Sequence, residues 1–291
     1  MSAGTSNRVL SIQSTVVWGY VGNKTAVFPL QVRNVERKES TVQNQKPVWV
    51  SQPAYTAEGE VHGFDVSPIN TVQFSNHTGY IGSRSFLEKV VDVVKELKDK
   101  NPHLTYVCDP VMGDGGHLYV PADLVEPYRN LVVSQADILT PNQFELELLT
   151  ESKVGSEDEA LAAMGRLHEK GVKTVVLSSS DLGQPGTLVA LANGAREVYR
   201  LAIPSVDATF VGTGDLFACS LLIWLQKDRQ LKDAFEKTVA TVQAVMARTL
   251  DYARGNTAAG QKPSMADMEL QLVQSKADIE NPVVKLKAAK V

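Results

Sequence analysis

The sequence predicts an α/β fold with a mostly parallel central sheet and helices on both faces. Short runs rich in β-branched residues alternate with longer segments whose apolar residues recur three and four positions apart. Strands that alternate with helices in this way form parallel sheets with helical crossovers. A length of 291 residues, 43% of them hydrophobic, suits one large domain, and we expect residues 1–291 to form it.

The β-branched runs mark the expected strands, and the periodic segments mark the helices. The strand candidates are residues 9–13, 71–74, 105–108, 138–140, 175–178, 188–191 and 198–203. The helix candidates are residues 23–31, 86–98, 157–170, 214–226, 233–252 and 265–274, whereas the tail from residue 281 has no clear pattern. In such sheets ligands bind beyond the carboxyl ends of the strands, so polar residues that follow strands are the candidates for chemistry.

Composition and charge favour a protein that acts on small molecules. The net charge is −4 with both signs interspersed, so we expect no nucleic-acid and no membrane partner. No stretch reaches membrane-spanning length and the first residues lack a signal-peptide core, which predicts a cytoplasmic protein. Cys108 and Cys219 lie in separate apolar runs and are expected to be buried, reduced thiols.

The run from Phe210 to Asp215 is the strongest candidate for a catalytic loop. Gly212 and Gly214 allow the backbone to adopt positive φ and approach a ligand, and a helix is expected to follow whose N-terminus attracts phosphate. Asp215 could then act as the base that takes the proton from an attacking hydroxyl. The alternative is a turn in which Asp215 caps the helix.

Polar residues follow three further strands. Asp109 and Asp114 suit magnesium, which needs only one or two carboxylates beside the phosphates of a nucleotide; the alternative is a solvated turn. Asn142 and Glu145 lie one helical turn apart and could face the same phosphate or metal, although Glu145 also fits as an acid complementing a helix N-terminus. Residues 178–181 offer hydroxyls and carbonyls to a nucleotide or a monovalent cation.

A set of ring and hydroxyl groups follows the second predicted strand. Phe74, His77, Thr78 and Tyr80 could together orient a flat ring. The alternative is that Phe74 belongs to the core and that His77 is a structural histidine.

Five motifs occur in order along the chain. They are Ser-Thr-Val-Val-Trp-Gly-Tyr-Val-Gly-Asn from Ser14, Val-Gln-Phe-Ser-Asn-His-Thr-Gly-Tyr ending at Tyr80, Cys-Asp-Pro-Val-Met-Gly-Asp ending at Asp114, Thr-Pro-Asn-Gln-Phe-Glu ending at Glu145 and Val-Gly-Thr-Gly-Asp-Leu-Phe ending at Phe217. Together they closely resemble the animal-type pyridoxal kinases of the ribokinase-like superfamily. The resemblance covers nearly all of the chain outside residues 33–62.

This resemblance implies ATP-dependent phosphorylation of the 5′-hydroxymethyl group of pyridoxal, pyridoxine and pyridoxamine by a cytosolic homodimer that uses Mg²⁺ and K⁺ or Na⁺. By motif, Asp215 would be the base and the N–H groups of Gly212, Thr213 and Gly214 the anion hole. The residues implied around the substrate are Ser14, Val21, Val72, Phe74, Thr78, Tyr80, Tyr119, Gly212 and Asp215. The residues implied for ATP are Asp109, Asn142, Ser178, Ser179, Val206, Asp207, Ala208 and Thr213, and those implied for the cations are Asp114, Glu145, Thr140 and Ser178.

The chain departs from this family in two places. Residues 33–62 form a polar insertion for which we expect local disorder, although residues 48–50 could make a strand. The family has two Thr-Gly-Tyr triplets separated by a helix and a strand, whereas this chain has one, ending at Tyr80. The missing β/α unit would leave two neighbouring strands unpaired, with one wall of the substrate pocket in question.

Two alternative functions therefore stay open. One is a non-catalytic isoform that binds ATP or pairs with a full-length subunit. The other is a kinase of another hydroxymethyl heterocycle, such as a pyrimidine.

Overall fold

A computed structural model describes residues 8–12, 20, 23–32, 48–51, 54–55, 61–62, 74–194, 196–258 and 261–291. Nine of the described strands form one sheet, in the order β13-β12-β11-β10-β9-β6-β5-β1-β2. These strands are β1 (Arg8–Ile12), β2 (Val48–Ser51), β5 (Phe74–Thr78), β6 (Thr105–Cys108), β9 (Ile138–Leu139), β10 (Thr174–Leu177), β11 (Thr187–Gly194), β12 (Val198–Pro204) and β13 (Ala289–Lys290). Neighbours from β2 to β10 are parallel, and β11 to β13 are added antiparallel.

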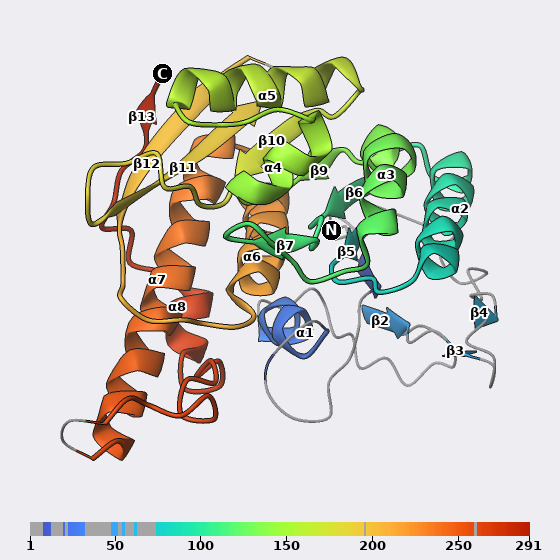
Figure 1. The fold of residues 1–291 in the computed structure, drawn as a ribbon. Helices are drawn as coiled ribbons and strands as arrows, with labels where there is room; N and C mark the ends of the chain where they lie inside the picture. Colours follow the sequence, from blue (N-terminus) through green and yellow to red (C-terminus); the bar gives the residue numbers. More distant parts are fainter. Residues whose placement is uncertain are drawn as a thin grey trace, which may run out of the picture.

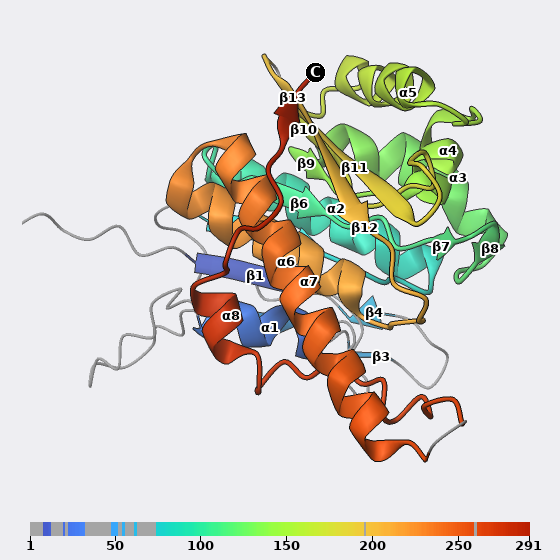
Figure 2. The same ribbon diagram turned by 90° about the vertical axis from the view of Figure 1, so that its left-hand side faces the viewer.

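Helices cover both faces of this sheet, as predicted (Figures 1 and 2). The helices are α1 (Asn23–Val32), α2 (Arg84–Lys100), α3 (Val125–Pro127), α4 (Gln143–Thr150), α5 (Glu157–Glu169), α6 (Thr213–Asp228), α7 (Leu231–Asn256) and α8 (Lys276–Glu280). Two small hairpins, β3 (Ala54–Tyr55) with β4 (Val61–His62) and β7 (Gly113–Asp114) with β8 (His117–Leu118), lie outside the main sheet. Within the described ranges, no helix is long and apolar enough to cross a membrane.

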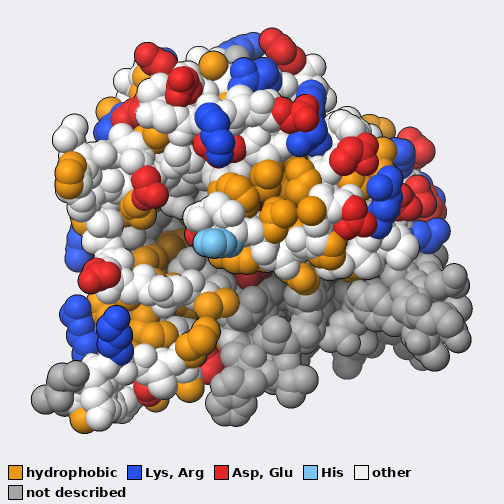
Figure 3. All heavy atoms as spheres, in the orientation of Figure 1, with side chains coloured by type: hydrophobic (Ala, Val, Ile, Leu, Met, Phe, Trp, Pro, Cys, Tyr) orange, Lys and Arg blue, Asp and Glu red, His pale blue; other side chains and the backbone are white. Residues whose placement is uncertain are grey.

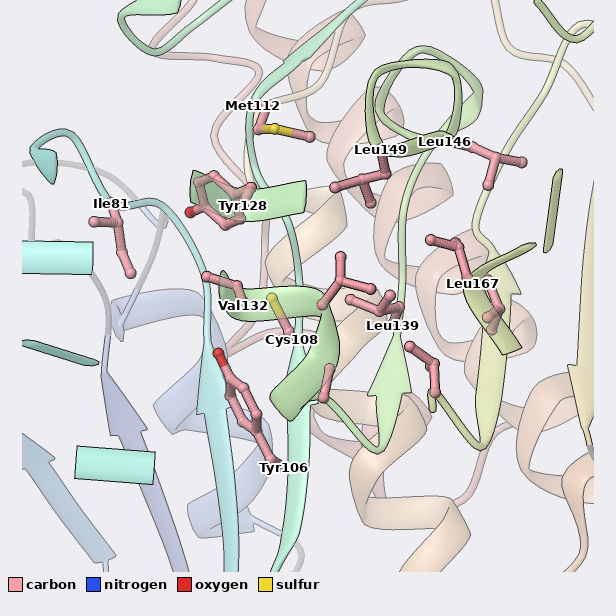
Figure 4. Packing of buried hydrophobic residues seen from close by; sticks show 14 of the residues in the cluster. Ile81, Tyr106, Cys108, Met112, Tyr128, Val132, Leu139, Leu146, Leu149 and Leu167 are labelled. Atoms are coloured by element: carbon pink, nitrogen blue, oxygen red, sulfur yellow. The ribbon is translucent and has the colours of Figure 1, made fainter. Parts of the chain in front are cut away.

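Side chains that alternate along the central strands build the two halves of the core. Tyr106 and Cys108 of β6 pack with the apolar residues of α2, α4 and α5, whereas Val107 between them packs with α1, α6 and α7. Successive strand residues point to opposite faces, so a strand covered on both sides must be apolar throughout. Figure 4 shows the first half, in which Met112 lies near Tyr128 and Cys108 lies near Leu139.

The sheet is continuous at the place where the loss of a strand was expected. Strand β5 pairs in parallel with β1 on one side, at Ile12 and Thr78, and with β6 on the other, at Thr78 and Cys108. The unpaired neighbours predicted for this chain are therefore not found here. Strand β2, from the insertion, pairs with the outer edge of β1 and confirms the strand expected at residues 48–50.

For the rest of residues 33–62, local disorder remains a prediction. The short strands β2, β3 and β4 lie within residues 33–62, the stretch for which we predicted local disorder. The rest of that stretch lies outside the described residues, as do residues 71–73 of the predicted strand 71–74, which overlaps β5 only at Phe74.

The helix predicted at residues 265–274 is wrong. The segment forms turns, and helix α8 begins only at Lys276. Leu270 and Leu272 are both buried, and the N–H of Gln271 between them donates to the hydroxyl of Thr249 on α7. This tertiary contact holds the chain against α7 and outweighs the local helical pattern.

The C-terminal tail has more structure than its sequence indicated. The buried carboxylate of Glu236 on α7 accepts hydrogen bonds from the N–H of Ala288, at 2.9 Å, and from the ammonium of Lys287, at 3.0 Å. The residues that follow form β13 at the edge of the sheet. Both cysteines are buried and free, as predicted.

Candidate active site

The carboxyl ends of β6, β9 and β10 bring three predicted site residues to one edge of the sheet. Thr140 donates its hydroxyl to Asp109 Oδ1 at 3.2 Å and its N–H to the carbonyl of Cys108 at 3.1 Å. Ser178 donates its N–H and its hydroxyl to the carbonyl of Pro141, at 2.9 and 3.3 Å. The loops expected to hold nucleotide and cation are thus linked directly to one another.

Helix α6 begins at this same edge. Gly212 is its N-cap, with φ +87°, and Asp215 lies in its first turn with only 7% of its surface exposed. The alternative in which Asp215 caps the helix is therefore wrong. A Cβ atom built on Gly214 would lie 3.6 Å from Asp109 Oδ2, so the N-terminus of α6 lies against the loop that follows β6.

Three carboxyl groups share this buried region. Burial raises the pKa of Asp109 well above its ordinary value, and the nearby carboxyls of Glu145 and Asp215 raise it further. Asp109 Oδ2 is buried and has no hydrogen-bond partner among the described residues. An acceptor oxygen in this position fits a cation, which would both satisfy it and favour its charged form.

Asn142 and Glu145 form a capping box at the start of α4. Asn142 Oδ1 accepts from the N–H of Glu145, and Glu145 Oε2 accepts from the N–H of Asn142, both at 2.9 Å. Glu145 Oε1 also accepts from the N–H of Met112 at 2.9 Å, and Asn142 Nδ2 donates to the carbonyl of Gly113 at 2.8 Å. Burial raises the pKa of Glu145 to about 8, although these N–H donors oppose the rise. Both side chains therefore position the loop after β6.

That loop continues into the β7–β8 hairpin, which carries Asp114 and leads into Tyr119. Gly115 and Gly116, with φ +54° and +84°, make its turn. Burial raises the pKa of Tyr119, and the charges of Asp114 and Glu145 raise it further, so the predicted substrate and metal residues lie near one another. Tyr119 is 58% exposed and adjoins Leu118, which is 40% exposed. Figure 3 shows hydrophobic side chains gathered on this face of the molecule.

Two predicted nucleotide segments lie further along the edge. The carbonyl of Ser179 accepts from the N–H of Gln143 in α4, which links it to the cluster. Val206, Asp207 and Ala208 form a turn between β12 and α6 in which the N–H of Ala208 donates to the carbonyl of Val206 at 2.8 Å. They are half-buried or exposed, and the chain that follows them leads to Gly212 at the start of α6.

The predicted substrate side is described only in part. Ser14, Val21 and Val72 lie outside the described residues, and Phe74 and Thr78 begin and end β5 as backbone positions. Tyr80 lies two residues after the end of β5 and is half-buried against the apolar core. Its ring lies beside Gly82, where a built Cβ atom would come within 3.2 Å of Tyr80 Cε1.

Sequence reasoning missed three residues at this site. Thr25 and Tyr128 each carry a buried hydroxyl with no hydrogen-bond partner among the described residues. A Cβ atom built on Gly113 would overlap the backbone carbonyl oxygen of His117, so the β7–β8 hairpin can close only with glycine there. Gly113 lies inside a motif already identified, whereas no sequence signal marks the two hydroxyls.

Known proteins resemble this chain along almost its entire length. The sequence model of the phosphomethylpyrimidine kinase family matches residues 75–259. The pyridoxal kinase of Sus scrofa is 44% identical over 98% of this chain and 95% of its own length, and that of Arabidopsis thaliana is 40% identical over 97% and 94%. The solved pyridoxal kinase from Leishmania donovani in complex with ADP and pyridoxamine has a TM-score of 0.80 at 26% identity, over 98% of this chain and 99% of that one.

Proposed function

The chain belongs to the pyridoxal kinase family, and we propose that it transfers the terminal phosphoryl group of ATP to the 5′-hydroxymethyl group of pyridoxal, pyridoxine and pyridoxamine. One observation carries this proposal for the chain itself. The carboxyl of Asp215 lies in the first turn of α6, behind a glycine N-cap and beside the carboxyl cluster of Asp109. The fold likeness to a kinase solved with ADP and pyridoxamine supports the same reaction.

Asp215 is the general base in this proposal. An acceptor hydroxyl placed at the N-terminus of α6 gives its proton to the Asp215 carboxylate as its oxygen attacks the terminal phosphorus of ATP, and the bond from that phosphorus to the bridging oxygen breaks to release ADP. Positioned bases of this kind contribute about 10²–10⁴-fold to the rate. The surroundings of Asp215, with 7% exposure, limit access of water as a competing acceptor.

The backbone of α6 stabilises the transferred group. The N–H groups of Gly212, Thr213 and Gly214 lie at the helix start, where they are not used by helical hydrogen bonds. Together with the positive end of the helix dipole they favour the negative charge on the equatorial oxygens of the phosphoryl group. No side chain is needed for this role, which explains why small residues precede Asp215.

The proposed cation sites lie at the same edge of the sheet. Asp109 and Asp114 would hold Mg²⁺ together with the phosphates of ATP, with Asn142 and Glu145 fixing the loop between them. Bound magnesium would neutralise the negative charge on the phosphates of ATP, including the charge that develops on the leaving group. We assign the monovalent cation, K⁺ or Na⁺, to Thr140 and Ser178, whose loops meet at the carbonyl of Pro141.

The nucleotide and the pyridine ring occupy opposite sides of Asp215 in this proposal. Ser178, Ser179 and the turn at 206–208 are assigned to the nucleotide side, and Tyr119, which follows β8, is assigned to the side of the pyridine ring. We assign Tyr80, which lies two residues after the strand between β1 and β6, to the pyridine side. The substrate residues assigned by motif are Ser14, Val21, Val72, Phe74 and Thr78. We further propose a cytoplasmic homodimer.

The direct test is formation of pyridoxal 5′-phosphate from pyridoxal and Mg-ATP by the full chain, with thermal melts in parallel. We expect product from the wild-type protein, a loss of about 10²–10⁴-fold in turnover for Asp215→Asn, and an unchanged ATP-induced rise in melting temperature for that variant. Near-normal turnover of Asp215→Asn would refute the base assignment.

A substrate panel separates the alternatives. Turnover of a hydroxymethylpyrimidine in place of every B6 vitamer would favour the other heterocycle, an alternative kept open by the family match over residues 75–259. ATP binding by a folded wild-type chain that turns over neither class would identify the non-catalytic isoform.

A further inference from the structure

Thr25 lies where the first turn of α1 meets the N-cap of α6. A Cβ atom built on Gly212 would overlap the carbonyl oxygen of Tyr20 and would lie 3.1 Å from Thr25 Oγ1. Thr25 is thus in close contact with the turn that aims the N–H groups of α6. Figure 1 shows α1 beside the end of α6 at which the chain enters that helix.

The hydroxyl of Thr25 is unusual among the buried threonines of the described helices. Thr238, Thr241 and Thr249 on α7 each donate their hydroxyl to the carbonyl four residues earlier, at 2.7 to 2.9 Å. Thr25 is the third residue of α1, so no helical residue lies four positions before it. It is fully buried, and Oγ1 has no hydrogen-bond partner among the described residues.

A buried hydroxyl without a partner costs free energy that an apolar side chain of the same shape would avoid. Its position, at the first turns of two helices whose N-termini both favour anions, indicates the group that would satisfy it. We propose that Thr25 completes the phosphoryl site of α6, and that its hydroxyl donates to a phosphoryl oxygen, or to a water bound to that oxygen, when nucleotide is present. This inference rests on the proposed kinase function and adds a residue to it.

The test compares Thr25→Val, which keeps the shape and removes the hydroxyl, with Thr25→Ser, which keeps the hydroxyl. For Thr25→Val we expect a ligand-free melting temperature equal to or above that of the wild type, because the unsatisfied hydroxyl is gone. We also expect a smaller rise in melting temperature with Mg-ATP in the absence of acceptor, and a fall of about tenfold or more in kcat/KM for Mg-ATP. Thr25→Ser should keep most of the rise in melting temperature with Mg-ATP and most of the kcat/KM for Mg-ATP.

Thr238→Val is the matched control, because Thr238 is equally buried but its hydroxyl bonds to Ala234 on α7. It should lower the melting temperature while leaving the response to Mg-ATP unchanged. The proposal is overturned if Thr25→Val responds to Mg-ATP as the wild type does. It is also overturned if Thr25→Val loses ligand-free stability as Thr238→Val does. If the wild type forms no product from any vitamer, the proposed pyridoxal kinase activity is refuted independently of Thr25. The rise in melting temperature with Mg-ATP still decides the role of Thr25 in that case.

Discussion

Replacement of Gly212 by alanine tests whether the turn before α6 aims the catalytic groups. Gly212 has φ +87°, a region that residues with a Cβ atom enter at a cost of about 1–2 kcal/mol. The added Cβ would also overlap the carbonyl oxygen of Tyr20, with Thr25 Oγ1 3.1 Å away, and overpacking of this kind costs about 1–3 kcal/mol.

The sum is a loss of about 2–5 kcal/mol in the free energy of unfolding, unless the turn moves to relieve it. A stability of about 5–15 kcal/mol would leave the variant folded. Movement of the turn relieves the overlap but displaces the N–H groups of Thr213 and Gly214 and the carboxyl of Asp215. A displacement of about 1 Å costs about 10²-fold in rate. Gly212→Ala should therefore lose stability, turnover or both.

Urea unfolding together with steady-state kinetics measures both quantities. Gly165→Ala is the matched control, because Gly165 lies inside α5 with open space around its Cα. That change should raise stability by about 0.5–1 kcal/mol and leave kinetics unchanged. A Gly212→Ala protein with wild-type stability and wild-type turnover would refute the reasoning.

Two further predictions concern buried carboxyl groups. Burial raises the pKa of Glu145 to about 8, so between the ordinary value and pH 8 unfolding releases a proton and the free energy of unfolding falls by about 1.4 kcal/mol per pH unit. The stability advantage of the wild type over Glu145→Gln should shrink from about pH 5 to about pH 8 in urea titrations, and a constant difference would contradict this. For Asp137, burial alone would raise the pKa, but hydrogen bonds from Lys173, the N–H of Tyr106 and Lys98 outweigh it and leave the pKa lowered. Asp137→Asn should cost about 1.5–3 kcal/mol at neutral pH, and melts should show this loss beginning to shrink below about pH 4, as the pH falls toward the lowered pKa; a loss independent of pH would argue against the ion pairs.

The fold was predictable wherever local pattern and tertiary packing agree. The strand at Thr105–Cys108 was predicted to the residue, because both of its faces are buried and its side chains are apolar or β-branched. Residues 265–274 also have a helical pattern, yet the hydrogen bond from Gln271 to Thr249 and the burial of Leu270 hold them in turns. A pattern cannot report a contact made with a helix some twenty residues earlier.

The motifs predicted which side chains lie together at one edge of the sheet, but not all of the local contacts that these side chains make. The motifs bring Asp109, Thr140 and Asp215 to one edge, as the order of the strands requires. The spacing of Asn142 and Glu145 was compatible with a ligand pair or a helix cap, and the structure shows the cap. Thr25 could not be identified from the sequence, because its contact with Gly212 joins two segments that are far apart along the chain.

The pairing of β2 with β1 bears on how such a chain can change. A parallel strand is held by main-chain groups, so the edge of a sheet accepts an incoming segment largely regardless of its sequence. Here β5 and β2 pair with β1 on its two sides, and the loops after β6, β9 and β10 are hydrogen-bonded to one another. A change of polypeptide at this border would therefore alter the residues proposed to line the acceptor site and leave in place those proposed for phosphoryl transfer. In the proposed kinase, the acceptor specificity could then change without any change in the residues proposed for phosphoryl transfer.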